Sequence, residues 1–534
     1  MSRGRKRRLL VIVAVIGLFP VTALAQRQFN FSGSLESNTV CDDDGDSPYK
    51  GFHSNNYLKL NAAHGRFSAG LQAEWYPDPL PGFDLSLKGI GLPMKYLSWD
   101  GGDWKLTAGD FYEQFGSGLI LRSWEDRDLG LGNSLGGLHL STDLLDGALS
   151  FKALGGIPRR GLGYASTAVF GGDAVLSPLR LIAPGNAHSL TLEGSVLDRF
   201  EWKTEEDIGL LLGAPAPEHI LLYSARMSYA WRSLLLKAEY AGKGKDFTAV
   251  RQNGSSDTYT LAGGRAAMVE LNYADGPFSG SASWRYLDNM AMRAYRTVGT
   301  LSVSNTLNYL PALCQQQTYM LSGLNPYETY AEGENGFRGD LYYRFRRGTA
   351  LGGRYGMRLH AGGSWINALG KVLPRRDHDC LAYRDLNIDL ERTWSRKFKT
   401  TLFVSIQESS PTHGNRKATN AQNVFVLEGL NKFSRAVSLR WELQYLYSQE
   451  LTKDWMAALL ELGIAPSWSI TLSDMYNHGD TKEHYWNASV AYSYKSLRAM
   501  LGYGRHREGM FCSGGVCRWQ PEYKGASLAL QWSF

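Results

Sequence analysis

Charged side chains recur at every second position in several segments between residues 337 and 443. Inside a pore, a row of Arg facing a row of Asp and Glu would create a transverse field that discriminates between ions. The alternative is a ladder of ion pairs between neighbouring strands that fills and braces the interior. Both interpretations predict that Arg358 faces the interior, and only the first predicts that its charge changes ion selectivity. The candidates are Arg338, Arg344, Arg346, Arg354, Arg358, His360, Asp385, Asp389, Glu391, Arg440 and Glu442.

A second charged stretch, residues 111–133, is a candidate for a loop that folds into the same interior. Several glycines could supply the bends, and side chains of both signs lie close together in it. Such a loop would gate or narrow a pore, whereas the alternative is an ordinary solvated outer loop. The charged candidates in this stretch are Arg122, Glu125, Asp126, Arg127 and Asp128.

Motifs for catalysis or metal binding are weak in this sequence. Residues 132–136 match G-x-S-x-G, but a nucleophile elbow needs a strand–turn–helix context that is not indicated here. The acidic run 42–46 lacks the spacing and the closing Glu of an EF-hand, which favours a solvated loop tip. There is no Cys-x₂-Cys pair and the 11 His are scattered, so we predict no catalytic residue, no metal and no cofactor.

The five cysteines are expected in loops outside the cell. Cys512 and Cys517 enclose a short Gly-Gly turn and are disulfide candidates in an oxidising compartment. A second pair could join Cys314 and Cys380, which would leave Cys41 free.

The elements that must position these side chains follow a two-residue period. In residues 397–408, Phe398, Leu402 and Ile406 alternate with polar residues such as Lys399 and Thr401. Strict alternation places the two sets on opposite faces of a sheet. The segments run for about 10 to 13 residues, which is longer than most soluble strands and long enough to cross a bilayer at a tilt.

The connections alternate between tight turns and long polar loops, which is typical of outer-membrane barrels. Hydrocarbon offers no hydrogen bonds to the backbone, so a spanning sheet must close on itself. We therefore predict an all-β fold: one antiparallel transmembrane barrel over residues 26–534, with 24 strands as the best count and 20 to 26 as the range. Both chain ends are expected on the periplasmic side. The long loops are residues 39–54, 199–218, 243–263, 288–336, 365–382, 409–423 and 508–524.

The N-terminus predicts a secretory signal peptide over residues 1–25. Five basic residues precede an apolar run that ends in Ala23-Leu24-Ala25, a small-x-small cleavage site. Those five belong to the 57 Lys and Arg of the chain, against 51 Asp and Glu, so the mature chain is near neutral. Near neutrality gives no electrostatic reason to expect a nucleic-acid partner.

Aromatic residues make up 12 % of the chain and lie near many of the predicted strand ends, as in interfacial girdles. The last strand ends in Trp532-Ser533-Phe534. Trp532 and Phe534 resemble the C-terminal signal that the outer-membrane insertion machinery recognises. The expected partners are therefore outer-membrane lipid, this machinery and other envelope proteins.

Three stretches resemble a known family. Residues 109–125 read GDFYEQFGSGLILRSWE, residues 31–38 read FSGSLESN, and residues 512–518 read CSGGVCR. Together they resemble an uncharacterised outer-membrane β-barrel family of Bacteroidota. The resemblance implies the barrel fold and the outer membrane, and it implies no activity.

The leading hypothesis for function is a passive pore for small polar solutes with a mixed-charge lumen. The first alternative is a non-conducting scaffold, an accessory subunit of an assembly, secretion or uptake complex in the outer membrane. The second alternative is a surface hydrolase.

Overall fold

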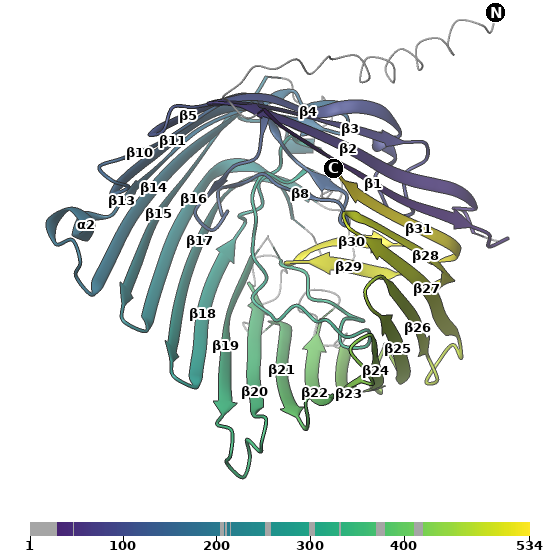
Figure 1. Cartoon of the computed structure of the whole chain (residues 1–534). Coiled ribbons are helices and arrows are strands. Elements are labelled where there is room, and N and C mark those ends of the chain that lie inside the picture. Colours follow the sequence, from purple (N-terminus) through teal and green to yellow (C-terminus); the bar gives the residue numbers. More distant parts are fainter. Residues whose placement is uncertain are drawn as a thin grey trace, which may run out of the picture.

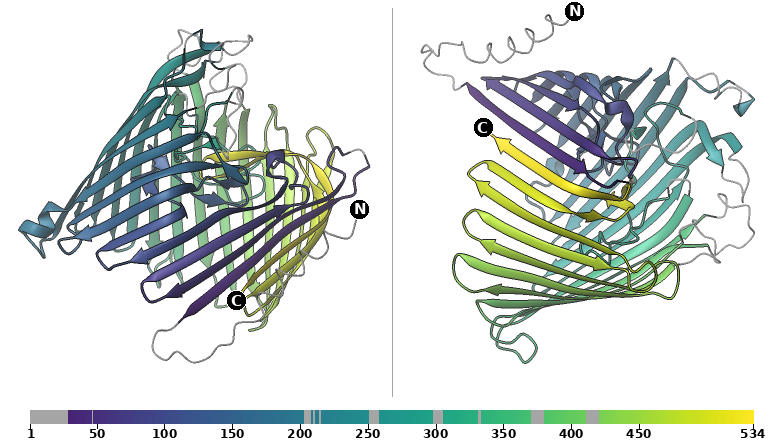
Figure 2. Two further views of the ribbon diagram at one scale, coloured as in Figure 1. Left: turned by 90° about the horizontal axis from the view of Figure 1, so that it is seen from above. Right: turned by 90° about the vertical axis from the view of Figure 1, so that its right-hand side faces the viewer.

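The computed structural model describes residues 29–45, 47–202, 208, 211–213, 215–250, 258–297, 305–330, 333–369, 380–410 and 420–534. The predicted signal peptide lies outside these residues. Within them, 24 antiparallel strands pair in sequence order, and the last strand pairs with the first (Figures 1 and 2). The prediction of a closed 24-stranded barrel is confirmed.

The ring strands are about as long as the sequence predicts. They are β1 (Asn30–Asp42), β2 (Gly51–His64), β3 (Phe67–Tyr76), β4 (Gly89–Asp100), β5 (Trp104–Phe111), β10 (Leu135–Leu144), β11 (Leu149–Arg160), β13 (Thr167–Leu176), β14 (His188–Glu201), β15 (His219–Trp231), β16 (Leu234–Val250), β17 (Thr258–Asp275), β18 (Phe278–Asp288), β19 (Gly333–Phe345), β20 (Met357–Ala368), β21 (Cys380–Thr393), β22 (Phe398–Ser409), β23 (Asn420–Lys432), β24 (Val437–Tyr447), β25 (Trp455–Ile464), β26 (Trp468–Tyr476), β27 (His484–Tyr494), β28 (Leu497–His506) and β31 (Tyr523–Ser533).

Short elements lie in the connections between these strands. They are η1 (Leu85–Leu87), β6 (Gln114–Phe115), β7 (Leu121–Arg122), β8 (Glu125–Asp126), β9 (Leu131–Gly132), β12 (Gly163–Tyr164), α2 (Pro178–Ile182), β29 (Gly509–Ser513) and β30 (Val516–Gln520). None of the helices in the described ranges is long and apolar enough to cross a membrane.

The two faces of the ring differ in polarity. On β22 and β24 the outward side chains include Leu402 and Leu443, which are 46 % and 57 % exposed. The intervening positions on β22, Ser405 and Gln407, point inward and are buried. An apolar band of this kind around a soluble protein would leave a large hydrophobic surface in water. In a bilayer the same band is solvated by acyl chains.

The two ends of the ring differ in their connections. At the short-turn end, two-residue hairpins such as that at Arg232 place a residue at positive φ, which matches the strand twist. The first described strand, β1, begins and the last strand, β31, ends at this end, where Phe534 and Gly33 exchange backbone hydrogen bonds of 2.8 and 2.9 Å (Figure 2, right). The longest connections lie at the opposite, long-loop end, whereas the short-turn end has two longer connections, residues 177–187 and 346–356.

Several strand boundaries differ from the predicted ones. β16 continues to Val250 and β17 starts at Thr258, in a stretch that the sequence predicts as a loop. The polar residues there show no alternation because a hairpin projecting beyond an apolar band has no apolar face to maintain. Alternation in the sequence predicts a strand from residue 83, but β4 starts only at Gly89, because Asp84 caps the short helix η1.

Candidate functional site: the lumen and its inward segments

Three connections at the long-loop end fold into the ring instead of projecting from it. We call them the lumen segments: first, residues 112–134; second, the described residues 289–297 and 305–330; third, residues 507–522, which contain the β29–β30 hairpin. They contact one another through backbone hydrogen bonds, from Arg122 N to the Leu307 carbonyl at 2.8 Å and from Tyr309 N to the Gly118 carbonyl at 2.9 Å. Figure 1 shows β8 and the β29–β30 hairpin inside the ring.

Apolar side chains fix the first two lumen segments against the wall. Leu119, Ile120 and Leu121 are fully buried with Leu197 and Leu222, which point inward from β14 and β15. Burying such a side chain contributes roughly 1.5–3 kcal/mol. The structure thus places residues 112–134 in the interior, the first of the two alternatives for this stretch.

The second lumen segment continues across the ring to the opposite wall. Leu321 and Leu324 pack with Phe403, Val424 and Leu446 on β22, β23 and β24. This one connection therefore contacts both sides of the interior.

A buried network of four charges joins the second lumen segment to the wall. Arg296 contacts Asp246 at 2.8 Å and Glu201 at 2.9 Å. Arg199 contacts the same carboxylates at 3.2 and 3.4 Å and donates to the Arg293 carbonyl at 2.8 Å. The two arginine side chains are almost completely buried, so each depends on these carboxylates for neutralisation.

Asparagine side chains hold the backbone of the first two lumen segments through hydrogen bonds. The Asn308 amide donates to the carbonyls of Leu119 and Met290 at 2.8 and 2.7 Å, and its oxygen accepts from Met292 N. The amide oxygen of Asn133 accepts from Trp124 N at 2.6 Å. Such bonds pair buried polar backbone groups that have no strand neighbour.

The charged candidates of residues 112–134 contact either aromatic rings or the wall. The Arg122 guanidinium lies over the rings of Trp124 and Tyr309 at 4.7 and 4.1 Å. Arg127 bonds Glu36 on β1 at 2.6 Å and contacts Glu125 at 3.3 Å.

Glu113, in the same segment, contacts His139 at 2.6 Å and Lys152 at 2.7 Å. Burial alone would raise the pKa of Glu113, but its hydrogen bonds to His139 and Lys152 lower the pKa to about 2.

Several of the predicted charges on β19, β20 and β21 lie in ion pairs within a strand or between neighbouring strands. Asp340 accepts from Arg338 at 2.6 Å and contacts His360 at 3.1 Å, and His360 also contacts Asp389 at 2.6 Å. These contacts form a ladder of pairs, not two separated rows of opposite sign.

The ladder continues towards β24. Glu391 contacts Arg358 at 3.3 Å and Lys399 at 2.7 Å. Arg440 pairs with Glu442 on the same strand and contacts Glu461 on β25 at 3.4 Å. The inner wall is therefore densely charged but largely neutral.

The prediction that Arg346 and Arg354 lie on the lumen wall is wrong. β19 ends at Phe345 and β20 starts at Met357, so both arginines lie in the turn between them and are exposed. Gly348 and Gly353 adopt positive φ in this turn and end the alternation. Arg344 stays on β19, and Asp385 is buried on β21, where it accepts from Asn387 at 2.8 Å.

Several cavities lie beside the lumen segments. One of 840 Å³ lies between Tyr319 of the second lumen segment and a wall lined by Tyr342, Arg344 and Arg358. Another of 520 Å³ lies between the second and third lumen segments and is lined by Tyr309 and Cys314.

The cysteines differ from the prediction that all five lie in outer loops. Cys512 and Cys517 are disulfide-bonded across the β29–β30 hairpin, inside the ring. Cys314 lies in the second lumen segment, and burial raises the pKa of its thiol to about 12. Cys41 is in β1, near its end, and is exposed. Cys380 is the first residue of β21, and its side chain lies outside the described residues.

The G-x-S-x-G stretch contains Ser134, which is fully buried directly before β10. It connects the short strand β9 to β10, so the strand–turn–helix context of a nucleophile elbow is not formed there. Within the described residues no cluster of three or more His, Cys, Asp or Glu could hold a metal ion.

Sequence reasoning missed the buried network of Arg199, Glu201, Asp246 and Arg296. Arg199 and Glu201 continue the inward parity of β14, which would have been the available signal. Arg296 could not be found this way, because the second lumen segment has no strand period.

A family profile matches residues 5–534 and is described as DUF6029, a family of unknown function. None of the curated proteins matches the sequence. Three solved structures align over most of the chain at low identity.

The siderophore receptor PirA from Pseudomonas aeruginosa is 10 % identical over 95 % of this chain and 81 % of its own, with a TM-score of 0.39. OccK8 (OprE) from the same organism is 10 % identical over 84 % of this chain and 98 % of its own, with a TM-score of 0.36. The copper transporter OprC is 10 % identical over 96 % and 81 %, with a TM-score of 0.42.

Proposed function

We propose a transport role for this chain, which belongs to the DUF6029 family of unknown function. The protein forms a channel for small polar solutes in the outer membrane, and the lumen segments narrow it. The difference in polarity between the outer and the inner face of the ring supports this proposal. The outer face of the ring exposes apolar residues such as Leu402, whereas the inner face lines an 840 Å³ cavity with charged residues such as Arg358.

A ladder of ion pairs alone predicts no effect of its charges on ion selectivity, but Arg358 differs from the buried members of the ladder by its exposure. Its side chain is 67 % exposed although it contacts Glu391, so its field reaches solute in the cavity. A paired but exposed charge at a constriction influences ions because the polar wall replaces part of their hydration.

The chain's origin in Bacteroidota is part of the same proposal and is supported by the resemblance at residues 109–125. Insertion by the outer-membrane machinery through Trp532 and Phe534 is also part of it. These two side chains are exposed at the closing edge of the ring, next to Phe31 of β1.

Planar-bilayer conductance of the purified protein tests the channel. We expect measurable single-channel steps and an Arg358→Glu variant whose cation preference is higher than that of the wild type. Arg180→Glu is the matched control, because Arg180 is an exposed cation on α2, in a connection at the short-turn end.

Two results would contradict the proposal. One is an equal shift of selectivity in Arg358→Glu and Arg180→Glu, which would mean that net charge alone matters. The other is an inserted barrel that passes no current at any voltage.

A non-conducting scaffold is the second candidate, and the buried Arg296 network favours it. A segment tied to the wall by two carboxylates could close the interior permanently. Electrical silence together with stoichiometric co-purification of another envelope protein would support the scaffold.

A further inference from the structure

Charge is unevenly distributed around the rim at the short-turn end. Between β19 and β24 the connections at residues 346–356, 394–397 and 432–436 contain basic residues and no acidic residue. The rim beside β4, β5, β10 and β11 carries Asp100, Asp103, Asp143 and Asp146 instead. The basic residues of the rim between β19 and β24 are Arg346, Arg347, Arg354, Arg396, Lys397, Lys432 and Arg435.

The cations of the β21–β22 and β23–β24 turns are not neutralised. Arg396, Lys397, Lys432 and Arg435 are exposed, and they form no ion pair with any residue that the structure describes. The arginines of the inner wall differ, as Arg338 shows by its bond to Asp340. The rim therefore presents positive charge that the protein itself does not compensate.

Hydrogen bonds between neighbouring turns join residues 394–397, 432–438 and 463–468 into one surface, which we call the platform. Lys432 N donates to the Lys397 carbonyl and Ala465 N to the Ala436 carbonyl, both at 2.7 Å. Within the β23–β24 turn, the Ser434 hydroxyl oxygen accepts a hydrogen bond from Val437 N at 3.0 Å. The platform is fixed by its backbone before any ligand binds.

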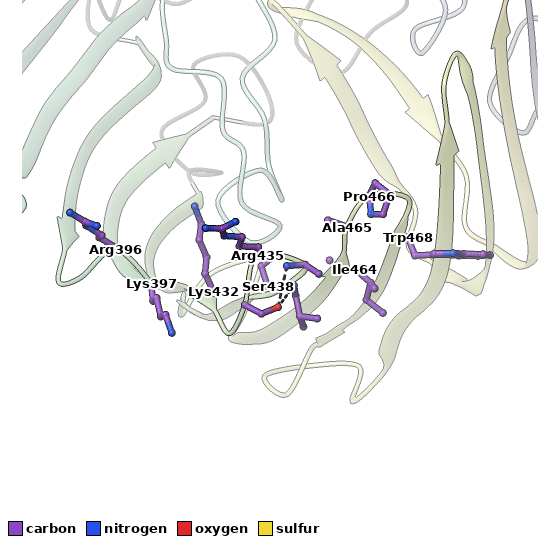
Figure 3. Close-up of a pocket in the computed structure, with 13 residues that line it drawn as sticks. Arg396, Lys397, Lys432, Arg435, Ser438, Ile464, Ala465, Pro466 and Trp468 are labelled. Atoms are coloured by element: carbon purple, nitrogen blue, oxygen red, sulfur yellow. Dashed lines mark hydrogen bonds between the residues drawn. The ribbon is translucent and has the colours of Figure 1, made fainter.

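A cavity of 740 Å³ opens between the turns of this platform (Figure 3). Arg396, Lys397, Lys432 and Arg435 lie along one part of it, and Ile464, Pro466 and Trp468 lie along the other. The cavity thus combines a positive side with an apolar side.

Exposed aromatic rings on the platform indicate that it lies at the edge of the apolar band. Trp394, Phe433 and Trp468 are 51 %, 59 % and 51 % exposed. Aromatic rings at the ends of barrel strands lie at the headgroup level of a bilayer. The neighbouring cations would then lie where lipid phosphates lie.

We propose that this platform, residues 394–397, 432–438 and 463–468, binds the phosphate of anionic phospholipid headgroups in the periplasmic leaflet. The inference rests on the proposed placement in the outer membrane. Arginine can donate two parallel hydrogen bonds to a phosphate, and lysine adds a point charge. Trp468 and Ile464 contact the acyl chain next to the headgroup. An acidic soluble protein would match the charge but leaves these apolar side chains unexplained.

The test is lipid retention by the full-length protein in bilayer discs of phosphatidylethanolamine and phosphatidylglycerol, measured by native mass spectrometry. The test variant is Arg396→Glu/Lys397→Glu/Lys432→Glu/Arg435→Glu. The control variant is Arg180→Glu/Arg232→Glu/Lys495→Glu, which changes charges in connections at other parts of the same rim.

We expect the wild type and the control to retain phosphatidylglycerol in preference to phosphatidylethanolamine, and the test variant to retain about tenfold less phosphatidylglycerol. Added salt should weaken retention, because screening acts on exposed charges. Displacement by inorganic phosphate at the same concentration as lipid would show a free-anion site and overturn the proposal. Binding of an acidic protein without lipid preference would overturn it too.

The outcomes also separate this inference from the proposed function. A wild-type chain that fails to enter bilayers refutes both. A wild-type chain that inserts and conducts, but retains the two lipids equally, refutes only the lipid site.

Discussion

At the residue scale, the attachment of the second lumen segment depends on a few buried charges. Arg296 and Arg199 share Glu201 and Asp246, so removing one cation leaves a carboxylate pair only half neutralised. A buried charge without a partner is far more costly than a neutral replacement of the whole group. This segment should therefore respond strongly to a single substitution.

Arg296→Met is expected to weaken the attachment of the second lumen segment by about 3–5 kcal/mol. The side chain of Cys314 lies in that segment and is only partly exposed, so its alkylation rate reports on detachment. We expect faster alkylation by a neutral maleimide in a background that carries Cys41→Ser and Cys380→Ser. The same background with Arg180→Met should keep the slow rate. An unchanged rate in Arg296→Met would show that the network does not hold the segment.

Glu113 gives a prediction for pH. Its pKa is lowered to about 2 by its bonds to His139 and Lys152, so its stabilisation is complete above the unfolded pKa near 4.5. The stabilisation is lost as the pH falls through the folded pKa. The difference in thermal unfolding midpoint between the wild type and Glu113→Gln should therefore be largest at neutral pH and vanish near pH 2. A difference that does not depend on pH would contradict this assignment.

At the scale of elements, strands and lumen segments follow different rules. The strands could be predicted because the apolar surroundings of the outer face require one apolar residue in two, as at Leu402 and Ile406. This requirement ends beyond the apolar band, which is why the extensions of β16 and β17 were not predicted.

The lumen segments have no such period. Leu307, Leu321 and Leu324 are buried at irregular spacing, and their partners are distant in sequence. Only the charge and glycine content of residues 111–133 indicated an inward loop. The ion-pair ladder could be predicted as one of two alternatives, because parity tells which side chains point inward but not how closely opposite charges approach.

The β29–β30 hairpin is the element that joins the third lumen segment to the second. Its tip has Gly514 and Gly515 at φ of 59° and 89°, and the Gly514 carbonyl accepts from the Tyr309 hydroxyl at 2.7 Å. A Cβ at Gly514 would lie 2.6 Å from that hydroxyl oxygen. The disulfide between Cys512 and Cys517 holds this tip in shape.

Cys512→Ser/Cys517→Ser is expected to increase amide hydrogen exchange in residues 507–522 and, through the lost contact, in residues 309–312. The physical reason is that a short loop without its cross-link samples open conformations more often. Cys41→Ser is the control, because Cys41 is exposed and unpaired with either cysteine of the hairpin. Faster exchange confined to the hairpin itself would show that it does not support the second segment.

At the scale of the whole molecule, the pairing of β1 with β31 closes the ring. Phe534 hydrogen-bonds Gly33 through its backbone, while its ring and that of Trp532 are exposed. The backbone closes the barrel, and the exposed rings are free for recognition during assembly.

Phe534→Ala should therefore lower the amount of barrel that reaches the outer membrane in cells, but not the yield of refolding in detergent. Leu528→Ala on the same strand is the control, because Leu528 is exposed away from the terminus. Equal losses in cells and in detergent would mean that Phe534 acts on stability and not as a signal.

If a polar path runs through the barrel, the second lumen segment restricts it. Single-channel recording of the wild type and Arg296→Met in the same bilayer measures this restriction. We expect small or rare openings in the wild type and larger or more frequent openings in Arg296→Met. Identical currents in the two proteins, or silence in both, would contradict it.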